Sequence, residues 1–383
     1  LLFFPYYKHT GIKSNKSFNI ISIPNYRNTF FGYYDISPFN PKDSHQVIFH
    51  ANNANIYSKP KPTKTDILMY NLISNEIKSL GETYAWNWQQ GARLMWLNER
   101  TIIYNIFNKD SQKYGSKMLD IITNIETHLD YPIQVAFKDK FYLSISYEAL
   151  QLIRPDYGYR CTNPDWKNID KNEIVFTDLS TLENKVLINI VDLHKKYISI
   201  VSDVRKCKAK FNHLLIAPDG SKFIFLYRYY NGSQRHHVLF KYDLKNDTID
   251  DLLMDQLVSH YSWIDDDTLL FWGVVNGQQG YFKLNVVSKE LSPVKVNIGD
   301  GHPTTYSNNQ VISDSYPNKS LLRSAFYLNL ENCSINKIAS IFHLPFFRGE
   351  TRCDPHPSIS TDKKYLQVDT ITQKGRNVCI IDL

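Results

Sequence analysis

The sequence has few cysteines and no long hydrophobic run. Its five cysteines, in 383 residues, are odd in number and form no Cys-x-x-Cys pair, so we do not expect a disulfide framework. This favours a reducing compartment, and we expect a cytoplasmic protein. No stretch approaches the ~20 apolar residues of a membrane-spanning helix, so no membrane span is expected. The chain begins with LLFFPYY rather than Met, which leaves a preceding signal or anchor segment open.

Clustered basic charge is also missing. The net charge is +6, but Lys and Arg are scattered along the chain, so no nucleic-acid partner is expected. A mild positive balance suits an anionic glycan as partner, and it equally describes an ordinary solvated surface. The paired carboxylates of a glycoside hydrolase are not evident either.

What the sequence does contain is a repeat. A loop followed by an apolar run recurs seven times, and each copy except the last is followed by a strand, turn and strand pattern with Asn, Asp or Ser at the turn. The seven copies start near Phe31, Ala85, Tyr131, Phe211, Ser259, Gly301 and Cys353. Aromatic residues, which favour strands, make up 14% of the chain. The long interval between the third and fourth copies indicates an insertion near residues 150–210.

A unit of about 40–50 residues with four strands is typical of a propeller blade. We therefore predict an all-β, seven-bladed β-propeller that forms a single domain over residues 1–383. A solenoid and a two-domain chain remain as alternatives. The last unit contains only three strands, so we expect the run Phe18–Pro24 to supply its outer strand and close the ring. Helix is expected mainly within residues 192–206.

Equivalent loops of a propeller face one central funnel, and here they carry polar residues at matching positions. These are Tyr34, Asp35, Gln89, Gln90, His213, His260, His302, Asp354 and His356. The third blade offers no obvious polar group. Four of the 12 histidines thus share one phase in four consecutive blades. A single such histidine is more often structural, but four in phase predict that at least three face one pocket.

Two kinds of chemistry fit these residues. Neutral imidazoles with a carboxylate are good ligands for a divalent metal such as Zn, Mn, Fe or Ni, and Asp354 and His356 are two candidate ligands on one loop. A metal-free site would use histidine as acid or base, with Arg228, Arg352, Arg93 and Tyr306 as carboxylate binders or proton carriers. The aromatic residues Trp86, Trp88, Trp263, Tyr157 and Tyr159 either form a sugar-stacking wall or pack between blades.

Several segments resemble the oligogalacturonate lyase family, a group of seven-bladed propeller lyases. The similarity is clearest in CDPHPSISTDKKYLQVDT and GHPTTYSNNQVISD, and it extends to FNHLLIAPDGSKFIFLYR and SHYSWIDDDTLLFW. The loops GYYDISP, WNWQQG and RCDPHP also resemble a broader set of bacterial lyase-like propellers of unassigned activity. In the lyases, three histidines and a glutamine hold manganese. His302 and His356 match two of these histidines, Asp354 stands in place of another, and the glutamine position falls near Thr351 and is lost.

The resemblance implies a lyase that cleaves a uronate-containing oligo- or polysaccharide by cation-assisted β-elimination. In that hypothesis a divalent metal, manganese by resemblance, is held by His302, His356 and Asp354, with His260 or His213 as a further ligand. Arg228 or Arg352 acts as base or carboxylate clamp, and Tyr306 or His213 acts as acid. The substrate contacts are Gln89, Gln90, Tyr34, Asp35 and Arg93. The alternative is a propeller that binds a glycan, or assembles surface polysaccharide, without cleaving it. The sequence assigns neither the glycan nor the oligomeric state.

Overall fold

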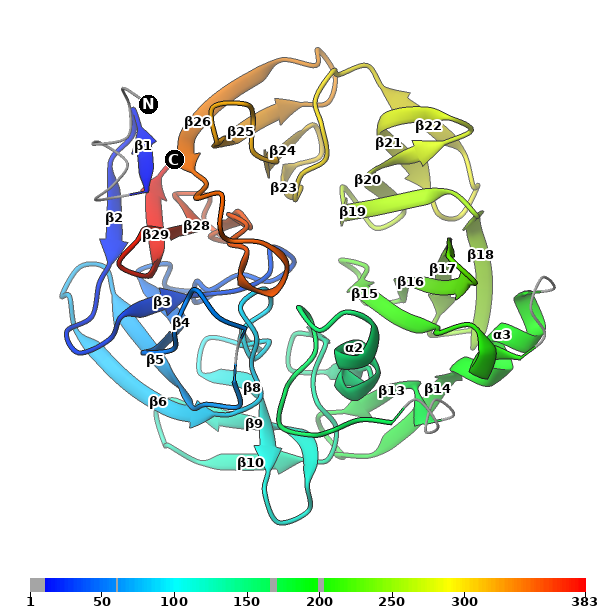
Figure 1. Cartoon of the computed structure of the whole chain (residues 1–383), viewed down its shortest axis with the longest axis horizontal. Helices are drawn as coiled ribbons and strands as arrows, with labels where there is room; N and C mark the ends of the chain where they lie inside the picture. Colours follow the sequence, from blue (N-terminus) through cyan, green and yellow to red (C-terminus); the bar gives the residue numbers. More distant parts are fainter. Residues whose placement is uncertain (1–10, 60, 166–170, 199–202) are drawn as a thin grey trace.

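A computed structural model describes residues 11–59, 61–165, 171–198 and 203–383. Its strands form seven sheets arranged as a ring around a central axis (Figure 1), so the fold is the expected seven-bladed propeller. Within each sheet the strands pair antiparallel and run from the centre outward in chain order, except that the outermost strands of the last two blades come from the N-terminal part of the chain.

The strands of the first four blades have the following bounds. Blade 1 contains β3 (Asn28–Phe30), β4 (Gln46–Asn52), β5 (Thr65–Asn71) and β6 (Ile77–Thr83). Blade 2 contains β7 (Met95–Trp96), β8 (Thr101–Asn108), β9 (Lys113–Asp120) and β10 (Glu126–Leu129). Blade 3 contains β11 (Val135–Phe137), β12 (Phe141–Ser144), β13 (Glu173–Asp178) and β14 (Asn184–Asn189). Blade 4 contains β15 (Lys210–Ile216), β16 (Lys222–Asn231), β17 (Gln234–Asp243) and β18 (Thr248–Met254).

The remaining three blades complete the ring. Blade 5 contains β19 (Leu257–Trp263), β20 (Thr268–Val275), β21 (Gln278–Asn285) and β22 (Leu291–Val294). Blade 6 contains β23 (Thr304–Ser307), β24 (Gln310–Asp314), β25 (Leu322–Asn329) and β26 (Ile335–Phe342). Blade 7 contains β27 (Ser358–Ile359), β28 (Tyr365–Ile371) and β29 (Arg376–Asp382).

One turn chemistry recurs at the outer hairpin of the first six blades. The third strand ends on an Asn or Asp whose side-chain oxygen accepts the backbone N–H groups two and three residues further on. These residues are Asn71, Asp120, Asp178, Asp243, Asn285 and Asn329. Such a side chain replaces a backbone partner and fixes the reversal of the chain. The Asn and Asp residues of the repeat therefore act at the expected place.

Two N-terminal strands close the ring. Strand β2 (Phe18–Ile21) pairs antiparallel with β29 and becomes the outer strand of blade 7, as predicted for this run. Strand β1 (Ile12–Ser14) pairs with β26 and gives blade 6 a fifth strand, which the sequence did not indicate. Both ends of the described chain thus meet at the same two blades (Figure 1). The pairing covers edges that would otherwise be open to association.

The described residues contain two short α-helices, and both lie in the predicted insertion. Helix α3 (Ile190–Tyr197) and the 3₁₀ turn η2 (Val204–Lys206) fall in or next to the expected helical stretch, of which residues 199–202 lie outside the described residues. Helix α2 (Tyr147–Ile153) was not predicted. Ser146 caps α2 by accepting the Ala149 N–H at 3.1 Å, an interaction typical of helix N-termini. No helix of the described residues is long and apolar enough to cross a membrane.

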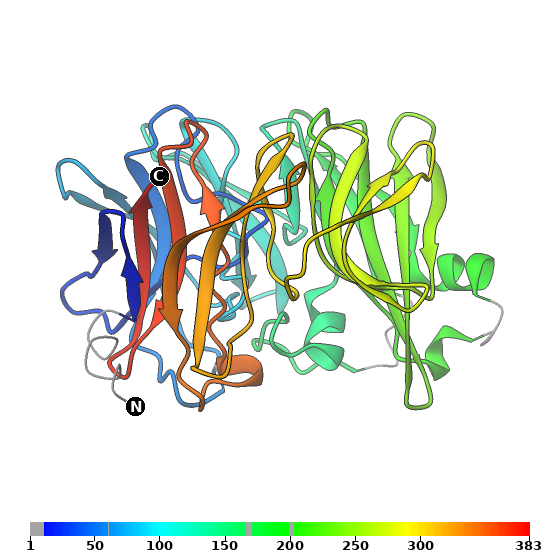
Figure 2. The same ribbon diagram turned by 90° about the horizontal axis from the view of Figure 1, so that it is seen from above.

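Helix α2 lies toward the middle of the ring rather than at its rim (Figure 1), and the side view places it at one face (Figure 2). Tyr159, in the loop that follows, stacks on Tyr147 with ring centroids 4.2 Å apart. The Tyr159 hydroxyl also accepts a hydrogen bond from Asn105 of blade 2 at 2.8 Å. These contacts bring the insertion loop to the axis, next to the loops of blade 7.

Candidate functional site

The four in-phase histidines lie in one row at the centre of the propeller. Successive ring centroids are 6.4 Å apart from His213 to His260, 4.2 Å from His260 to His302, and 4.4 Å from His302 to His356. Each residue comes from a different blade, 4 to 7 in order, and all four are buried. The structure therefore brings together the histidines that the sequence placed at one phase.

Asp314, at the end of β24, orients two of these histidines. Its carboxylate accepts the Nδ1–H of His302 at 2.8 Å and the backbone N–H of the same residue at 2.8 Å. It also accepts the backbone N–H of His356 at 3.3 Å. Because Nδ1 of His302 donates to the carboxylate, Nε2 carries the lone pair. A carboxylate behind a histidine is a common support for a metal ligand.

His302, Asp354 and His356 form a group that suits a divalent cation. Their ligand atoms all lie within 4.8 Å of one another, and all three residues are buried. Nε2 of His356 is buried and has no hydrogen-bond partner among the described residues, so its lone pair is unused or its N–H is unpaired. Burial keeps the pKa values of both imidazoles well below their usual range, so both are neutral. Two neutral imidazoles and one carboxylate oxygen match the ligand preferences of Mn, Fe or Zn.

Asp354 is at the same time the counter-ion of two arginines. Arg323 of β25 donates to Oδ1 at 2.6 Å, and Arg352 donates through Nε to Oδ2 at 2.7 Å. Burial alone would raise the pKa of Asp354, but these two cations hold it well below its usual range. The carboxylate is therefore ionised, and a cation at this site would share it with the arginines.

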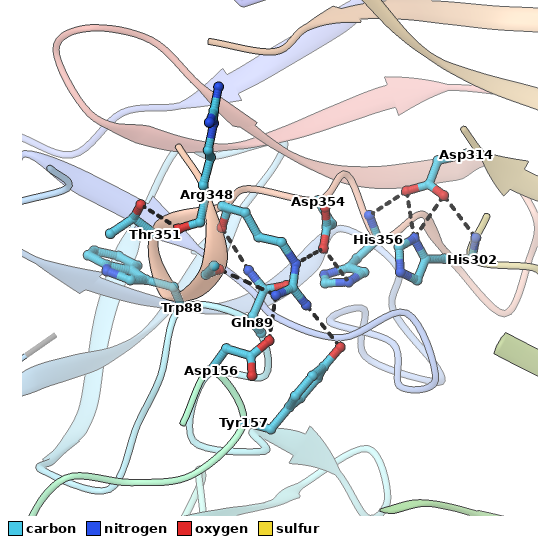
Figure 3. Close-up of polar contacts among 12 residues, drawn as sticks. Trp88, Gln89, Asp156, Tyr157, His302, Asp314, Arg348, Thr351, Asp354 and His356 are labelled. Atoms are coloured by element: carbon cyan, nitrogen blue, oxygen red, sulfur yellow. Dashed lines mark hydrogen bonds and ion pairs between the residues drawn. The ribbon is translucent and has the colours of Figure 1, made fainter. Parts of the chain in front are cut away.

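Arg352 connects the site to the insertion loop. Its NH1 donates to Asp156 at 2.5 Å, and its NH2 donates to the hydroxyl of Tyr157 at 3.1 Å. Figure 3 shows Asp156 and Tyr157 on one side of Asp354, with His356, His302 and Asp314 continuing on the other. Every nitrogen of the guanidinium thus has an acceptor, and its partners keep the pKa of Arg352 well above its usual value.

The residues predicted from blade 1 have different surroundings. The hydroxyl of Tyr34 shares a hydrogen bond of 3.0 Å with Nε2 of His213 and accepts the Tyr261 N–H at 3.0 Å, so Tyr34 is part of the histidine row. Asp35 and Arg93 form a bidentate ion pair, with both distances 2.9 Å and both side chains fully buried. This pair is closed off from any ligand, which corrects the expectation that it lines a substrate site.

The two glutamines of blade 2 lie beside the blade-7 loop. Nε2 of Gln89 donates to the backbone oxygen of Arg352 at 2.7 Å, while its Oε1 and the Oε1 of Gln90 are buried without a partner. Tyr306 is placed elsewhere. Its ring packs on Tyr327 at 5.3 Å and lies under Lys363, and none of its ring contacts in the described chain is with a histidine. The expected acid role of Tyr306 thus has no geometric support.

Arg228 and the tryptophans complete the predicted set. Arg228 of β16 is buried and donates from NH2 to the backbone oxygen of Val258 at 2.8 Å, but its Nε has no partner in the described residues. Burial lowers the pKa of Arg228 to about 10. Trp86 and Trp88 pack on each other with ring centroids 4.9 Å apart and are buried. These two tryptophans therefore pack in the core rather than form a sugar-stacking wall.

Sequence reasoning missed the residues that support the site. Asp314 and Arg323 hold the predicted ligands from behind, and Asp156 and Arg154 come from the insertion. The one available signal was Asp314, a charged residue that ends the apolar run Val-Ile-Ser-Asp. Blade 3 also contributes a polar residue, since Gln134 is buried and accepts from the Tyr147 hydroxyl at 2.8 Å.

A cavity of about 860 Å³ lies away from the histidine row, between blades 2 and 3 and helix α2. It is lined by residues such as Lys113, Tyr114, Tyr131, Ser146 and Glu173, and none of the predicted site residues lines it. This cavity therefore does not coincide with the predicted site, which is marked instead by the buried donors and acceptors that converge at the axis.

The fold and site define a seven-bladed propeller with a histidine-rich centre. Among solved structures, an oligogalacturonate lyase from Vibrio parahaemolyticus aligns over 97% of both chains with 13% identity and a TM-score of 0.63. An oligogalacturonate lyase in complex with manganese aligns over 97% of both chains with 14% identity and the same TM-score, 0.63. The chain thus resembles these lyases in fold.

More distant propellers also match. The β-propeller domain of the trilobed protease from Pyrococcus furiosus aligns over 88% of this chain and 92% of that one, with 11% identity and a TM-score of 0.55. No family model and no curated protein sequence matches the chain. At these identities the likeness establishes the fold, and activity has to be argued from the site.

Proposed function

We propose that this protein is a carbohydrate-active lyase that cleaves a uronate-containing oligo- or polysaccharide by cation-assisted β-elimination. The observation that carries the proposal is the buried group of His302, His356 and Asp354, whose ligand atoms lie within 4.8 Å of one another. A divalent cation bound there, manganese by analogy with the lyase complex, would neutralise the substrate carboxylate and make the neighbouring C5 proton more acidic.

In such a reaction the C5 proton passes to a base, the bond between C4 and the glycosidic oxygen breaks, a C4–C5 double bond forms, and the leaving oxygen takes up a proton. Arg352 is a poor base because each of its nitrogens already donates to a protein acceptor. Arg228 suits the role of base or carboxylate clamp better, since its Nε is unpartnered and burial lowers its pKa to about 10. His213, hydrogen-bonded to Tyr34, is the candidate acid for the leaving oxygen. Because burial keeps its pKa well below its usual range, it would hold that proton only when the negative charge of a bound uronate offsets the burial.

The test combines metal content and product formation. Purified protein analysed by elemental mass spectrometry is expected to hold about one equivalent of a divalent metal after incubation with it, and to release unsaturated, ultraviolet-absorbing products from a uronate oligosaccharide. The double variant His302→Ala/His356→Ala should lose both properties while it stays folded. His236→Gln is a matched control, because His236 is bonded to Asp255 outside the site. Wild-type protein that takes up no ion contradicts the proposal.

A second function is favoured by one observation. Both oxygens of Asp354 are already bonded to arginines, and the glutamine ligand of the lyases has no equivalent at Thr351. A propeller that binds an anionic glycan at the centre without cleaving it fits these facts. Saturable glycan binding without any unsaturated product, in the presence of each divalent ion, would establish this function instead.

A further inference from the structure

Three large aromatic side chains are exposed in the described part of the chain, and all three lie on one face of the propeller. They are Tyr57, Tyr316 and Phe346, which are 54%, 48% and 59% exposed. Tyr57 lies between the second and third strands of blade 1, Tyr316 between those of blade 6, and Phe346 between blades 6 and 7. In antiparallel blades, connections of these two kinds lie at the same end of the strands. Helix α2 also links a second strand to a third, so it marks this face (Figure 2).

Two of these rings form one surface. The hydroxyl of Tyr57 donates to the backbone oxygen of Gln373, between β28 and β29, at 3.0 Å. Its ring stacks on the buried Phe347, with centroids 5.3 Å apart and an angle of 27° between the planes. Phe346 places its own ring centroid 6.5 Å from that of Tyr57. The exposed rings of Tyr57 and Phe346 are therefore adjacent, and that of Tyr57 is held in a fixed orientation. We call this pair the rim platform.

The surroundings of the rim platform are basic. Lys59 and Arg348, each two residues from a platform ring, are both exposed. The single acid in residues 346–352 is Glu350, which is buried and accepts a hydrogen bond of 3.0 Å from Nε of Arg160. Lys59 is 3.6 Å from the same carboxylate. One buried, shared carboxylate thus faces several cations, and this excess of positive charge favours an anionic ligand.

One connection joins the rim platform to the histidine group. Phe346 lies six residues before Arg352 in the segment between β26 and β27, and six residues of fully extended chain span at most about 21 Å. Figure 3 shows Arg348, in the same segment, on the side of Asp354 away from His302. The distance from the platform to the candidate cation site is therefore one that an oligosaccharide covers.

The third exposed ring lies beside the central site. The guanidinium of Arg323, which donates to Asp354, is 5.8 Å from the ring centroid of Tyr316, and the charge of Asp354 also acts on the Tyr316 hydroxyl. Exposed rings thus lie both beside the histidine group and at the rim platform, as expected for a ligand that extends across this face.

We propose that the rim platform is a distal subsite, which binds sugar units of an acidic glycan while the reacting unit lies at the histidines. The apolar C–H faces of pyranose rings stack on Tyr57 and Phe346, and Lys59 and Arg348 attract the acidic groups of the chain. The inference deepens the proposed function and rests on it for the position of the reacting unit. It assigns the protein to glycan chains rather than to acidic disaccharides.

The probes are three uronate polymers, polygalacturonate, alginate and hyaluronan, each cast into native gels that contain a chelator to prevent cation-assisted cleavage. Wild type is expected to be retarded by at least one polymer. Tyr57→Ala/Phe346→Ala should weaken that binding by about tenfold, since two ring contacts are lost. The double variant keeps the net charge of the chain, so weaker binding would not come from a smaller general attraction between a basic protein and a polyanion.

Three further variants serve as controls. Ile122→Ala/Ile125→Ala removes two side chains that are 65% and 66% exposed between β9 and β10, at the opposite face, and it should leave polymer binding unchanged. Tyr57→Phe keeps the ring and loses the hydrogen bond to Gln373, so it should bind like wild type. Phe346→Ser breaks no side-chain hydrogen bond, and it should bind more weakly than wild type while its melting temperature stays the same.

Two results would overturn the inference. One is the absence of retardation by all three polymers, or equal retardation of wild type and the platform double variant. The other is a wild-type dimer that dissociates in the double variant while polymer binding is unaffected, measured by sedimentation, because the platform would then be an interface between two copies of the chain.

The two proposals fail separately. Unsaturated products from wild type, together with equal polymer binding in wild type and the double variant, would refute the rim platform alone. Platform-dependent polymer binding in a protein that takes up no divalent metal would refute the lyase proposal alone. Where both hold, the double variant should have a higher KM than wild type for the polymer and the same KM for a diuronate.

Discussion

The two sides of the central site differ in whether their buried basic side chains have carboxylate partners. On blades 6 and 7, Arg323 and Arg352 share the carboxylate of Asp354, and Arg352 also reaches Asp156. On blade 4, Arg228 is buried, and its one described hydrogen bond goes to the neutral backbone oxygen of Val258. The arginines of the first side therefore have carboxylate partners before any ligand binds. On the second side no such partner offsets burial, which lowers the pKa of Arg228 to about 10 and keeps the pKa of Lys210 well below its usual range.

This contrast separates the side of the site whose geometry is fixed by ion pairs from the side whose basic residues have no carboxylate partner. His302 and His356 are held by Asp314, so the candidate cation site is organised before anything binds, which is what efficient binding requires.

The largest effect is expected from Asp354→Ala. The change leaves the buried guanidiniums of Arg323 and Arg352 without their shared carboxylate, and breaking a buried ion pair in this way costs about 3–5 kcal/mol of unfolding free energy. Urea unfolding monitored by fluorescence measures the loss. The double variant Asp354→Ala/Arg323→Met should be less destabilised than the single one, because one uncompensated charge is removed. If Asp354→Ala were as stable as wild type, the carboxylate of Asp354 would not be needed to compensate the two buried arginines, and the contrast between the two sides would be lost.

His50 provides a buried histidine outside the site. Its Nε2 accepts the Ala92 N–H at 3.0 Å, and its Nδ1 donates to the Phe30 oxygen at 3.3 Å. Burial lowers its pKa to about 4, below the 6.5 of an unfolded chain. Between these values only the unfolded chain binds the proton, so stability falls as the pH is lowered through this window, by roughly 3 kcal/mol in total.

The measurement compares unfolding free energies of wild type and His50→Gln at several pH values across that window. Because the variant lacks the titrating group, its stability should fall less than that of wild type on acidification. Its divalent metal content should stay unchanged, in contrast to His356→Ala, since both nitrogens of His50 are already bonded to backbone. An identical loss of stability in the two proteins would contradict the assignment of the low pKa to His50.

The sequence predicted the propeller and the histidine row because both follow from repetition. Seven similar four-strand units favour a ring, and equal phase in four of them brings His213, His260, His302 and His356 together. The supporting contacts are not repetitive. Asp314 clamps two histidines only because two loops converge on one strand end, and His213 and His356 adopt left-handed backbone with φ of 55° and 47°, which is uncommon for residues other than glycine. These contacts and backbone conformations do not recur from blade to blade, so no repeated pattern in the sequence predicts them.

The insertion was located by an excess of chain length, but its function was not. The length indicated extra chain between the third and fourth units and said nothing about Asp156 or Tyr157 meeting Arg352 from blade 7. That contact joins residues 195 and 196 positions apart, and no local pattern reports pairs so distant in sequence. Asp35 and Arg93 illustrate the converse error. Asp35 was expected to contact a ligand because of its in-phase placement, and Arg93 because arginine binds carboxylates, but in the structure they form a buried ion pair with each other.

The smallest expected effect is that of Tyr157→Phe. The change removes the hydroxyl that accepts from Arg352 at 3.1 Å and keeps the ring that packs against Tyr33 at 5.8 Å. Loss of one such hydrogen bond costs about 1 kcal/mol of unfolding free energy, measured by the same urea titration. Metal content should not change, because Asp354 keeps both arginines. A loss as large as that of Asp354→Ala would mean that the insertion, rather than the shared carboxylate, holds Arg352 in place.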